Sequence, residues 1–464
     1  MIQLLQLRCQ SQLRGLRRVV GGLFFGGLGA AAFFQLGTLG DGQRAWHGEH
    51  EDQKFSPKRT WGGAGFLKES YILSPLEQDA IADSEMFADH FGAAIATEGD
   101  RLLIGATRDC RGGSNHGWVH RFGFEEEVDR WVLKGDVSPV KRSPNSYFGK
   151  GLAIHEGLLF VGAYGCKESH QAMNVGKVVA FVERGGDWVQ SGDVVAPEMP
   201  SYALLNDSRN LRQRAFGESL SVDGDWLAIH ADEEVSITPK KGPLYLYRHG
   251  SGGMSEFQQR LPEGDPSLFP RVFAKQFELK NGQLAVASLG GAHGAPIQYD
   301  LYGFDEGKDL WVLSDQIDDP EEAKSGSFVP GERDGPVLFT VDGFLLWGDE
   351  NGDWCQWKLG TAKGYSRSQH VFFSREYGLA YSVKTKQDGE NWHFVVYHPM
   401  GSDGRLNSNP LFLAPSLHHR RGLSDIVIAD NGDVMVGQRE VATGEFECGG
   451  VFVWRRRDLL SAEY

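Results

Sequence analysis

The sequence predicts an all-β protein, and three observations lead to this fold class. The chain repeats a unit of four short apolar runs separated by turn residues, as in residues 147–197, which is typical of a four-stranded antiparallel sheet. The unit recurs along most of the chain. Runs such as Leu102-Leu103-Ile104 are apolar on successive residues, so both faces of each sheet need cover. Radial stacking of the sheets provides that cover, which predicts a β-propeller.

The number of repeats gives the number of blades. The units span residues 90–139, 147–197, 215–264, 272–318, 336–360, 370–415 and 425–456. The last three are degraded. In the fifth unit the fourth strand would have to fit into residues 361–369, where no strand pattern is found. We therefore predict a seven-bladed propeller of four-stranded antiparallel blades over residues 66–456, with its weakest point in the fifth blade.

One strand stands before the first unit. Residues 66–75 read FLKESYILSP and match the fourth-strand pattern WVLKGDVSP of residues 131–139. The last unit has only three strands. We expect residues 66–75 to complete the last blade and so to fasten the two ends of the chain together.

Two short motifs recur at the strands. Phe91-Gly92 is followed by Gly105-Ala106, and Phe148-Gly149 by Gly162-Ala163. Phe216-Gly217 keeps only the first half of this pairing. The pattern resembles the FG-GAP repeat of integrin-alpha-like propellers and of many bacterial surface proteins. The resemblance is strong over residues 87–320, is absent from the last three units, and implies a fold more than a function.

Aromatic residues begin the fourth strands of the first four units. They are Trp131, Trp188, Phe257 and Trp311. A large apolar side chain that recurs once per repeat is expected to pack between adjacent repeats.

The N-terminus has the pattern of a targeting segment. Arginines, among them Arg17 and Arg18, precede an apolar run at residues 19–37, and no acidic residue occurs before Asp41. We predict a signal peptide at residues 1–32, a linker at 33–65 and a C-terminal tail at 457–464. The alternative is an uncleaved membrane anchor at residues 19–37. Either alternative predicts export, to a secreted, periplasmic or cell-surface location.

Charge limits the classes of partner. The chain has 62 acidic and 47 basic residues and a net charge of −15. An acidic surface disfavours nucleic acids and anionic membranes as partners. We expect a monomer that binds a protein or carbohydrate ligand and that contacts a membrane only through the possible N-terminal anchor.

Three of the five cysteines fall in loops between second and third strands. These are Cys110, Cys166 and Cys448, in the first, second and seventh units. An oxidising compartment would favour a disulfide among them, with Cys110–Cys166 as the first choice and Cys110–Cys448 as the second. Cys355 lies within a strand and is expected to be a buried free thiol.

Calcium binding is implied by the resemblance but is not expected here. The relatives bind calcium in a loop that follows the Phe-Gly strand, where this chain has tight turns such as His155-Glu156-Gly157. Those turns are too short to surround a cation that needs six to eight oxygen ligands. The nearest alternative is the loop with Asp349, Asn351 and Asp353, which we expect to be another turn. No cofactor is predicted.

Four histidines, His116, His170, His230 and His293, fall in or beside the loops between second and third strands. They would suit a metal site or acid–base catalysis, or they are ordinary polar loop residues. We predict a non-catalytic binding or adhesion scaffold with its ligand on one rim of the ring. The alternatives are a metal-assisted hydrolase or lyase that acts on an extracellular polymer, and a purely structural module.

Overall fold

The computed structural model describes most of the chain between residues 89 and 461 and two short strands before it. The described residues are 47–48, 70–73, 89–111, 114–166, 176–197, 215–231, 242–250, 252–261, 272–289, 297–322, 324–325, 335–339, 344–349, 351–358, 365–366, 370–387, 390–402, 404–407, 409–414, 422–443 and 446–461. The predicted signal peptide or anchor lies outside them, as does most of the predicted linker. Among the described residues no helix has the length and apolar character needed to cross a membrane.

The first four blades each contain four consecutive antiparallel strands. Blade 1 consists of β3 (Phe91–Glu98), β4 (Arg101–Ala106), β5 (Trp118–Glu125) and β6 (Arg130–Val137). Blade 2 consists of β7 (Leu152–His155), β8 (Leu158–Ala163), β9 (Lys177–Arg184) and β10 (Asp187–Val194). Blade 3 consists of β11 (Leu220–Asp223), β12 (Trp226–His230), β13 (Leu244–His249) and β14 (Ser255–Leu261). Blade 4 consists of β15 (Val272–Lys280), β16 (Gln283–Leu289), β17 (Ile297–Asp305) and β18 (Leu310–Ile317).

The other three blades take in short strands from earlier in the chain. Blade 5 consists of β20 (Val337–Phe339), β21 (Phe344–Gly348) and β22 (Trp354–Lys358), with β19 (Lys324–Ser325). Blade 6 consists of β24 (Val371–Ser374), β25 (Gly378–Gln387), β26 (Glu390–Pro399) and β27 (Leu411–Leu413), with β23 (Tyr365–Ser366). Blade 7 consists of β28 (Asp425–Ile428), β29 (Val434–Thr443) and β30 (Phe446–Trp454), with β2 (Ser70–Leu73) and β1 (His47–Gly48). A 3-10 helix, η3 (Pro320–Glu322), precedes β19, and α3 (Arg456–Ser461) follows β30.

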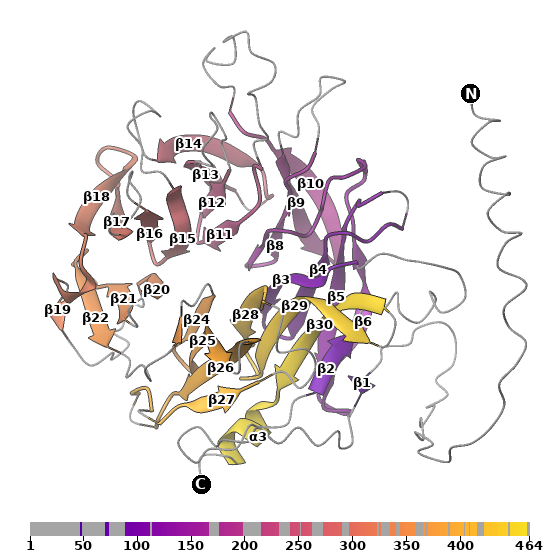
Figure 1. Ribbon diagram of the computed structural model, residues 1–464. Helices are drawn as coiled ribbons and strands as arrows, with labels where there is room; N and C mark the ends of the chain where they lie inside the picture. Colours follow the sequence, from indigo (N-terminus) through magenta and orange to yellow (C-terminus); the bar gives the residue numbers. More distant parts are fainter. Residues whose placement is uncertain are drawn as a thin grey trace, which may run out of the picture. The chain divides into compact units, whose positions relative to one another are not determined.

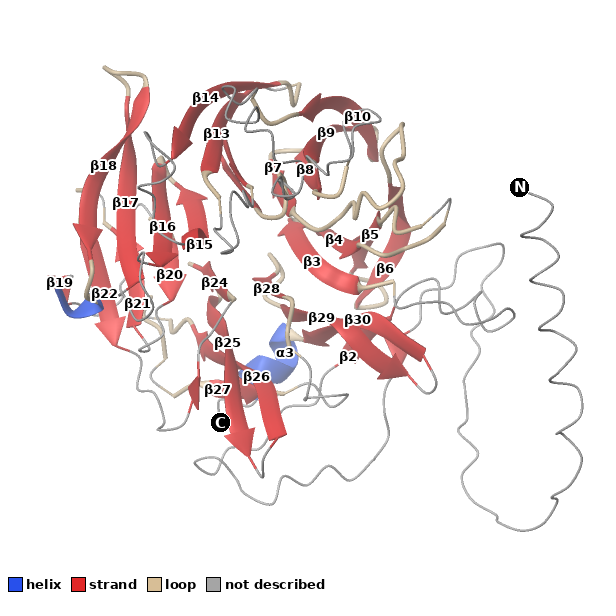
Figure 2. Ribbon diagram, turned by 45° about the horizontal axis from the view of Figure 1, so that its top comes forward, coloured by secondary structure: helices blue, strands red, loops and turns tan. Residues whose placement is uncertain are grey.

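The blades are arranged radially, as Figures 1 and 2 show. The first strand of each blade contacts the first strand of the next, in the order β3, β7, β11, β15, β20, β24 and β28, and β28 contacts β3 again. These first strands therefore surround the axis of the ring. The predicted all-β, seven-bladed propeller is confirmed.

The two ends of the ring carry different connections. Because successive strands in a blade are antiparallel, the loops between second and third strands emerge at the same end as the connections between blades. We call this end the loop rim. The hairpin turns between first and second strands emerge at the opposite end, and they have the predicted geometry. In the β7–β8 turn, Glu156 and Gly157 have φ of 49° and 74°, as a two-residue type I′ turn requires.

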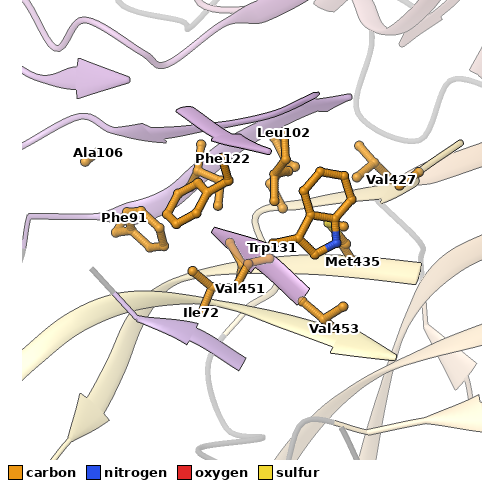
Figure 3. Close-up of a cluster of buried hydrophobic side chains, with 13 residues drawn as sticks. Ile72, Phe91, Leu102, Ala106, Phe122, Trp131, Val427, Met435, Val451 and Val453 are labelled. Carbon is orange, nitrogen blue, oxygen red and sulfur yellow. The ribbon is translucent and has the colours of Figure 1, made fainter. Parts of the chain in front are cut away.

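Blades 1 and 7 meet where the ends of the propeller come together. β2 pairs antiparallel with β30, from Ser70 opposite Val453 to Leu73 opposite Gly450. Figure 3 shows the cluster beside this pairing, in which Ile72 packs with residues of blades 1 and 7 around Trp131. β2 lies within residues 66–75, the segment assigned to the last blade from its sequence.

Blade 5 is where the repeat changes, as its sequence indicated. The place beside β22 is taken by β19, which comes from upstream of the blade and pairs with β22 in parallel. Of residues 361–369, Tyr365 and Ser366 form β23, which pairs with β25 of blade 6. The short segment after β22 thus contributes to the next blade, and an earlier segment fills the outer position of blade 5.

Glycines at equivalent positions explain the paired motif. A Cβ on Gly105 would overlap the carbonyl oxygen of Gly149 in the next blade. The same holds for Gly162 against Gly217. The second half of the motif therefore accommodates the Phe-Gly of the following blade, because only glycine lets the two backbones approach so closely.

A second glycine in each of these blades packs on the same neighbour. A Cβ on Gly117 would overlap the backbone of Phe148, and one on Gly176 would overlap that of Phe216. Blade 7 makes the same pair of contacts with blade 1. Its Gly437 lies against Gly92, and its Gly449 against Phe91. The seventh unit lacks the paired motif in its sequence, but it keeps the glycines that contact blade 1.

The fourth-strand aromatics follow the prediction in three blades out of four. Trp131 and Trp311 are 1% and 2% exposed and lie in clusters that span two blades, and Trp188 packs partly against a cluster of blades 1 and 2. Phe257 departs from the prediction. It is 42% exposed and contacts Tyr245 and Tyr247 of its own blade.

The chain after β30 is structured. Residues 456–461 of α3 overlap the segment assigned to a C-terminal tail, and Leu459 of α3 is buried among residues of blades 6 and 7.

Candidate functional site

The two predicted rim histidines that the structure describes are both buried. His116, in the loop before β5, is 7% exposed, and its carbonyl accepts hydrogen bonds from Ser146 Oγ (2.7 Å) and Phe148 N (3.1 Å). Burial, with the nearby charge of Arg142, lowers the pKa of His116. It is therefore a neutral side chain that lies beneath the loop rim.

His230 ends β12 and lies between blades. It is 2% exposed, and its ring lies 6.3 Å from that of Phe277 in β15 of blade 4. His170 and His293 fall outside the described residues. Among the residues that are described, no three side chains of metal-ligating type form a group.

The loop with Asp349 forms a turn closed by its own carboxylate. Asp349 Oδ1 accepts hydrogen bonds from the backbone N of Asn351 and of Asp353, both at 2.9 Å. The Asp349 N–H donates to the Asp353 carbonyl at 2.9 Å. A carboxylate that accepts backbone hydrogen bonds inside a five-residue loop is an Asx-type turn, as expected from the sequence.

Neither predicted disulfide is present. Cys110 and Cys166 are free thiols, so Cys110 is bonded neither to Cys166 nor to Cys448. The Cys110 Sγ donates to the carbonyl of Arg108 at 3.1 Å. Burial raises the pKa of Cys166 to about 11, so this thiol is protonated and unreactive at neutral pH. Cys355 forms no disulfide either, and it is half-buried where a buried thiol was expected.

A charged cluster that the sequence did not single out lies in blade 1. Arg111 pairs with Asp109 (2.7 Å) and Asp136 (2.8 Å), and His120 Nδ1 lies 2.7 Å from Asp136. Burial alone would raise the pKa of Asp136, but the hydrogen bond from His120 and the Arg111 charge together hold it below its usual value. His120 and Asp109 are fully buried. This cluster is internally satisfied and so is structural.

Arg111 also stacks on Trp118. The Cζ atoms of Arg111 and Arg142 lie 4.3 and 4.2 Å from the centroid of the Trp118 ring. The Trp118 Nε1 donates to the Arg111 carbonyl at 3.2 Å. These contacts hold the loop before β5 against the connection to blade 2.

The inner strands are joined by side chains that accept hydrogen bonds from the backbone of a neighbouring blade. Asp425 Oδ2 in β28 accepts from Ile95 N in β3 at 2.9 Å. Ser221 Oγ in β11 accepts from Leu279 N in β15 at 3.0 Å. Each contact satisfies a backbone N–H at the edge of an inner strand.

Asp425 gives the ring a pH-dependent contact. Burial raises its pKa from 3.8 to about 6, although the backbone N–H groups and Lys150 act in the opposite direction. A carboxyl with a raised pKa in the fold binds protons more readily when folded than when unfolded. Its contribution to the free energy of unfolding therefore rises as the pH falls below 6, by about 1.4 kcal/mol per pH unit down to about pH 4.

Asp425→Asn is expected to abolish this contribution. Urea unfolding of both proteins between pH 7.5 and 4.5 measures it, since the wild type should gain stability relative to the variant as the pH falls. His370 works the other way, because burial lowers its pKa to about 4, but it is present in both proteins and drops out of the difference. Parallel pH profiles for the two proteins would contradict the prediction.

Charged and aromatic residues stand at or near the loop-rim ends of the two inner strands in several blades. Lys150 and Glu218 each follow a Phe-Gly pair, and Tyr164 and Arg439 each stand two residues after an interblade glycine. Equivalent positions of the repeat lie at the same height in the ring. With the nearby Arg108 and His370, these residues define what we call the axial mouth: Arg108, Lys150, Tyr164, Glu218, His370 and Arg439.

Electrostatic interactions show that these residues lie near one another. Burial, followed by the charges of Tyr147 and Glu218, raises the pKa of Tyr164 to about 12, while Arg108 and Arg439 act to lower it. The Tyr164 ring stacks on Tyr147, with centroids 5.0 Å apart and planes inclined by 16°. The Tyr164 hydroxyl is therefore protonated at neutral pH and available as a hydrogen-bond donor.

The axial mouth brings several cations together. The charges of Lys150 and Arg439 act on His370, whose pKa burial lowers to about 4, so this imidazole is neutral at pH 7. Three of the six residues are cations, Arg108, Lys150 and Arg439, and one is a carboxylate, Glu218, while the carboxyl group of Asp425 lies near Lys150. Five blades supply these six residues.

Comparison with known proteins gives architecture only. No family model and no curated protein matches the chain. Solved structures of similar architecture include a candidate 6-phosphogluconolactonase from Bacteroides fragilis (11% identity, TM-score 0.42, 73% of this chain and 87% of that one). Others are Sqt1 from Saccharomyces cerevisiae (11%, 0.40, 81% and 84%) and BamB from Moraxella catarrhalis (11%, 0.36, 79% and 85%).

These likenesses assign no function, since the identities are low and the TM-scores lie below 0.5. None of the three is described as an integrin-type protein. The FG-GAP resemblance stays a prediction from the sequence, and the propeller fold rests on the strand topology itself.

Proposed function

We propose that the protein is an exported, non-catalytic binding propeller whose ligand is held at the axial mouth. One observation carries this proposal. The residue after Phe-Gly is alanine, lysine or glutamate in blades 1, 2 and 3 (Ala93, Lys150 and Glu218), while the glycines beside it keep their interblade contacts. A constant frame with different side chains at equivalent mouth positions is the arrangement by which propellers and other repeat folds present a specific surface.

A carbohydrate is the ligand class that these side chains favour. Beside the charged side chains of the mouth, Tyr164 stacks on Tyr147, and the Tyr164 hydroxyl can donate a hydrogen bond. Apolar ring faces together with a few placed polar groups are typical of sites for small polar ligands. The alternative is a protein ligand, which an array of glycans would not capture.

A glycan array probed with the full-length protein and a mouth-blocking variant tests the proposal. Glu218→Trp places a bulky side chain in the mouth regardless of ligand charge. Glu126→Trp is the matched control, because Glu126 is exposed in the β5–β6 turn at the opposite end of the ring. We expect at least one glycan to bind the wild type and the control but not Glu218→Trp. We also expect that glycan to remain uncleaved after the incubation.

Three results would overturn the proposal. One is a glycan that binds equally to all three proteins. Another is a glycan that is cleaved during incubation, which would favour the hydrolase or lyase alternative. The third is an array without any binding, combined with a protein partner that is unaffected by Glu218→Trp.

A further inference from the structure

Two exposed arginines flank the segment where blades 7 and 1 meet. The Arg108 N–H donates to the carbonyl of Asp89 at 2.8 Å. Arg439 stands two residues after Gly437, which lies against Gly92. Both residues therefore lie beside residues 89–92, where the Asp89 carboxylate accepts a hydrogen bond from Phe91 N at 3.0 Å, and the charges of both arginines act on the Tyr164 hydroxyl in blade 2.

Neither guanidinium group is paired with a residue that the structure describes. The guanidinium groups of Arg108 and Arg439 make no hydrogen bond or ion pair with any residue that the structure describes. Other arginines are paired, such as Arg111 with Asp109 and Arg455 with Asp433. Lys150 adds a third positive charge nearby, which acts on His370 together with Arg439.

This local charge is opposite to that of the whole chain. The protein carries 62 acidic and 47 basic residues, for a net charge of −15. A concentrated positive region in an acidic protein focuses the field and attracts anions to that place alone. Two neighbouring guanidinium groups suit an oxyanion, because each presents parallel N–H donors that match a carboxylate or phosphate.

We propose that the axial mouth binds an oxyanion, the carboxylate or phosphate group of a small sugar-like ligand, through Arg108 and Arg439. Lys150 lies on the blade 2 side of the mouth, and the Tyr164 hydroxyl donates to the same ligand. The inference rests on the proposed function, in that both place the ligand at the axial mouth. It goes further by assigning the charged group that the ligand carries.

Isothermal titration calorimetry of the full-length protein tests this with three defined probes. They are glucuronate, inorganic phosphate and the neutral methyl glucoside. We expect one or both anions to bind and the neutral sugar to bind at least tenfold more weakly. Arg108→Ala and Arg439→Ala should each weaken anion binding by about tenfold to hundredfold, the usual effect of removing a charge-assisted hydrogen bond. Binding should also weaken as the salt concentration rises.

Arg184→Ala is the matched control. Arg184 is an exposed arginine at the end of β9, beside the turn to β10 at the opposite end of the ring, so its loss changes the net charge equally and should leave the affinity unchanged. Thermal unfolding of each variant shows that it is folded. Binding of glucuronate alone assigns the carboxylate source, and binding of phosphate alone assigns the phosphate source.

Two results overturn the inference. The first is that neither anion binds the wild type. The second is that anion affinity is the same in Arg108→Ala, Arg439→Ala and Arg184→Ala. A neutral glycan whose array signal is lost in Glu218→Trp would overturn the anion assignment and still support the proposed function, so the two failures are distinguishable.

Discussion

Gly162→Ala is expected to lower the free energy of unfolding by about 3 kcal/mol or more. The new Cβ would overlap the carbonyl oxygen of Gly217 in the next blade. That oxygen belongs to the backbone and cannot rotate away as a side chain would, so the two blades must separate. Overpacking usually costs about 1 to 3 kcal/mol, and an overlap with backbone that cannot move aside is expected at or above the top of that range. Urea unfolding followed by tryptophan fluorescence measures the difference.

Gly303→Ala is the matched control for this substitution. Gly303 also lies within a strand, β17, but a Cβ there meets nothing within 4 Å. Its replacement is expected to change stability by less than about 1 kcal/mol, because alanine only lowers the entropy of the unfolded chain. Equal losses for the two variants would show that the close approach of Gly162 and Gly217 does not hold the blades together.

Asp433→Ala is expected to destabilise the protein by a similar amount, about 3 kcal/mol or more. Asp433 is 2% exposed and joins blade 7 to blade 1. Its carboxylate accepts hydrogen bonds from Trp131 Nε1 (3.2 Å) and from the backbone N of Arg456 (3.0 Å), and it pairs with Arg455 Nε (3.1 Å). The substitution removes the acceptor that these three groups share, and Arg455 keeps only its second carboxylate partner, Asp129.

Asp187→Ala serves as the control for this second variant. Asp187 also pairs with an arginine, Arg121, but its side chain is 81% exposed, and exposed ion pairs contribute about 1 kcal/mol or less. Near-equal unfolding midpoints for Asp433→Ala and the wild type would mean that the junction of blades 7 and 1 does not depend on this carboxylate.

The propeller was predictable because its signals are local. Alternating apolar runs and Gly-containing turns such as Asn281-Gly282 specify hairpins, and repetition specifies the ring. The glycines of blade 7 were missed for a physical reason. Each interblade glycine accommodates the Phe-Gly of the following blade, so Gly437 belongs with Gly92, at the other end of the chain. A unit examined alone shows only half of each contact.

The candidate site was less predictable, because it depends on which loop residues the packing buries. His116 and His230 looked like rim ligands in sequence, but contacts with Ser146 and Phe277 place them beneath the loop rim and between blades. Arg108 and Arg439 carried one sequence signal. Arg439 stands two residues after the interblade glycine Gly437, and Arg108 stands three residues after Gly105.

The pairing of β2 with β30 has a mechanical consequence. Ser70, the first residue of β2, lies opposite Val453 near the end of β30, so the chain segments that leave this junction depart from the same end of the pair. A force that pulls those two segments apart loads the hydrogen bonds one after another, because in antiparallel pairs they run across the strands. The junction therefore opens as a zipper does. Separating the two strands from this end needs less force than sliding one strand along the other, because the hydrogen bonds break in turn and not all at once.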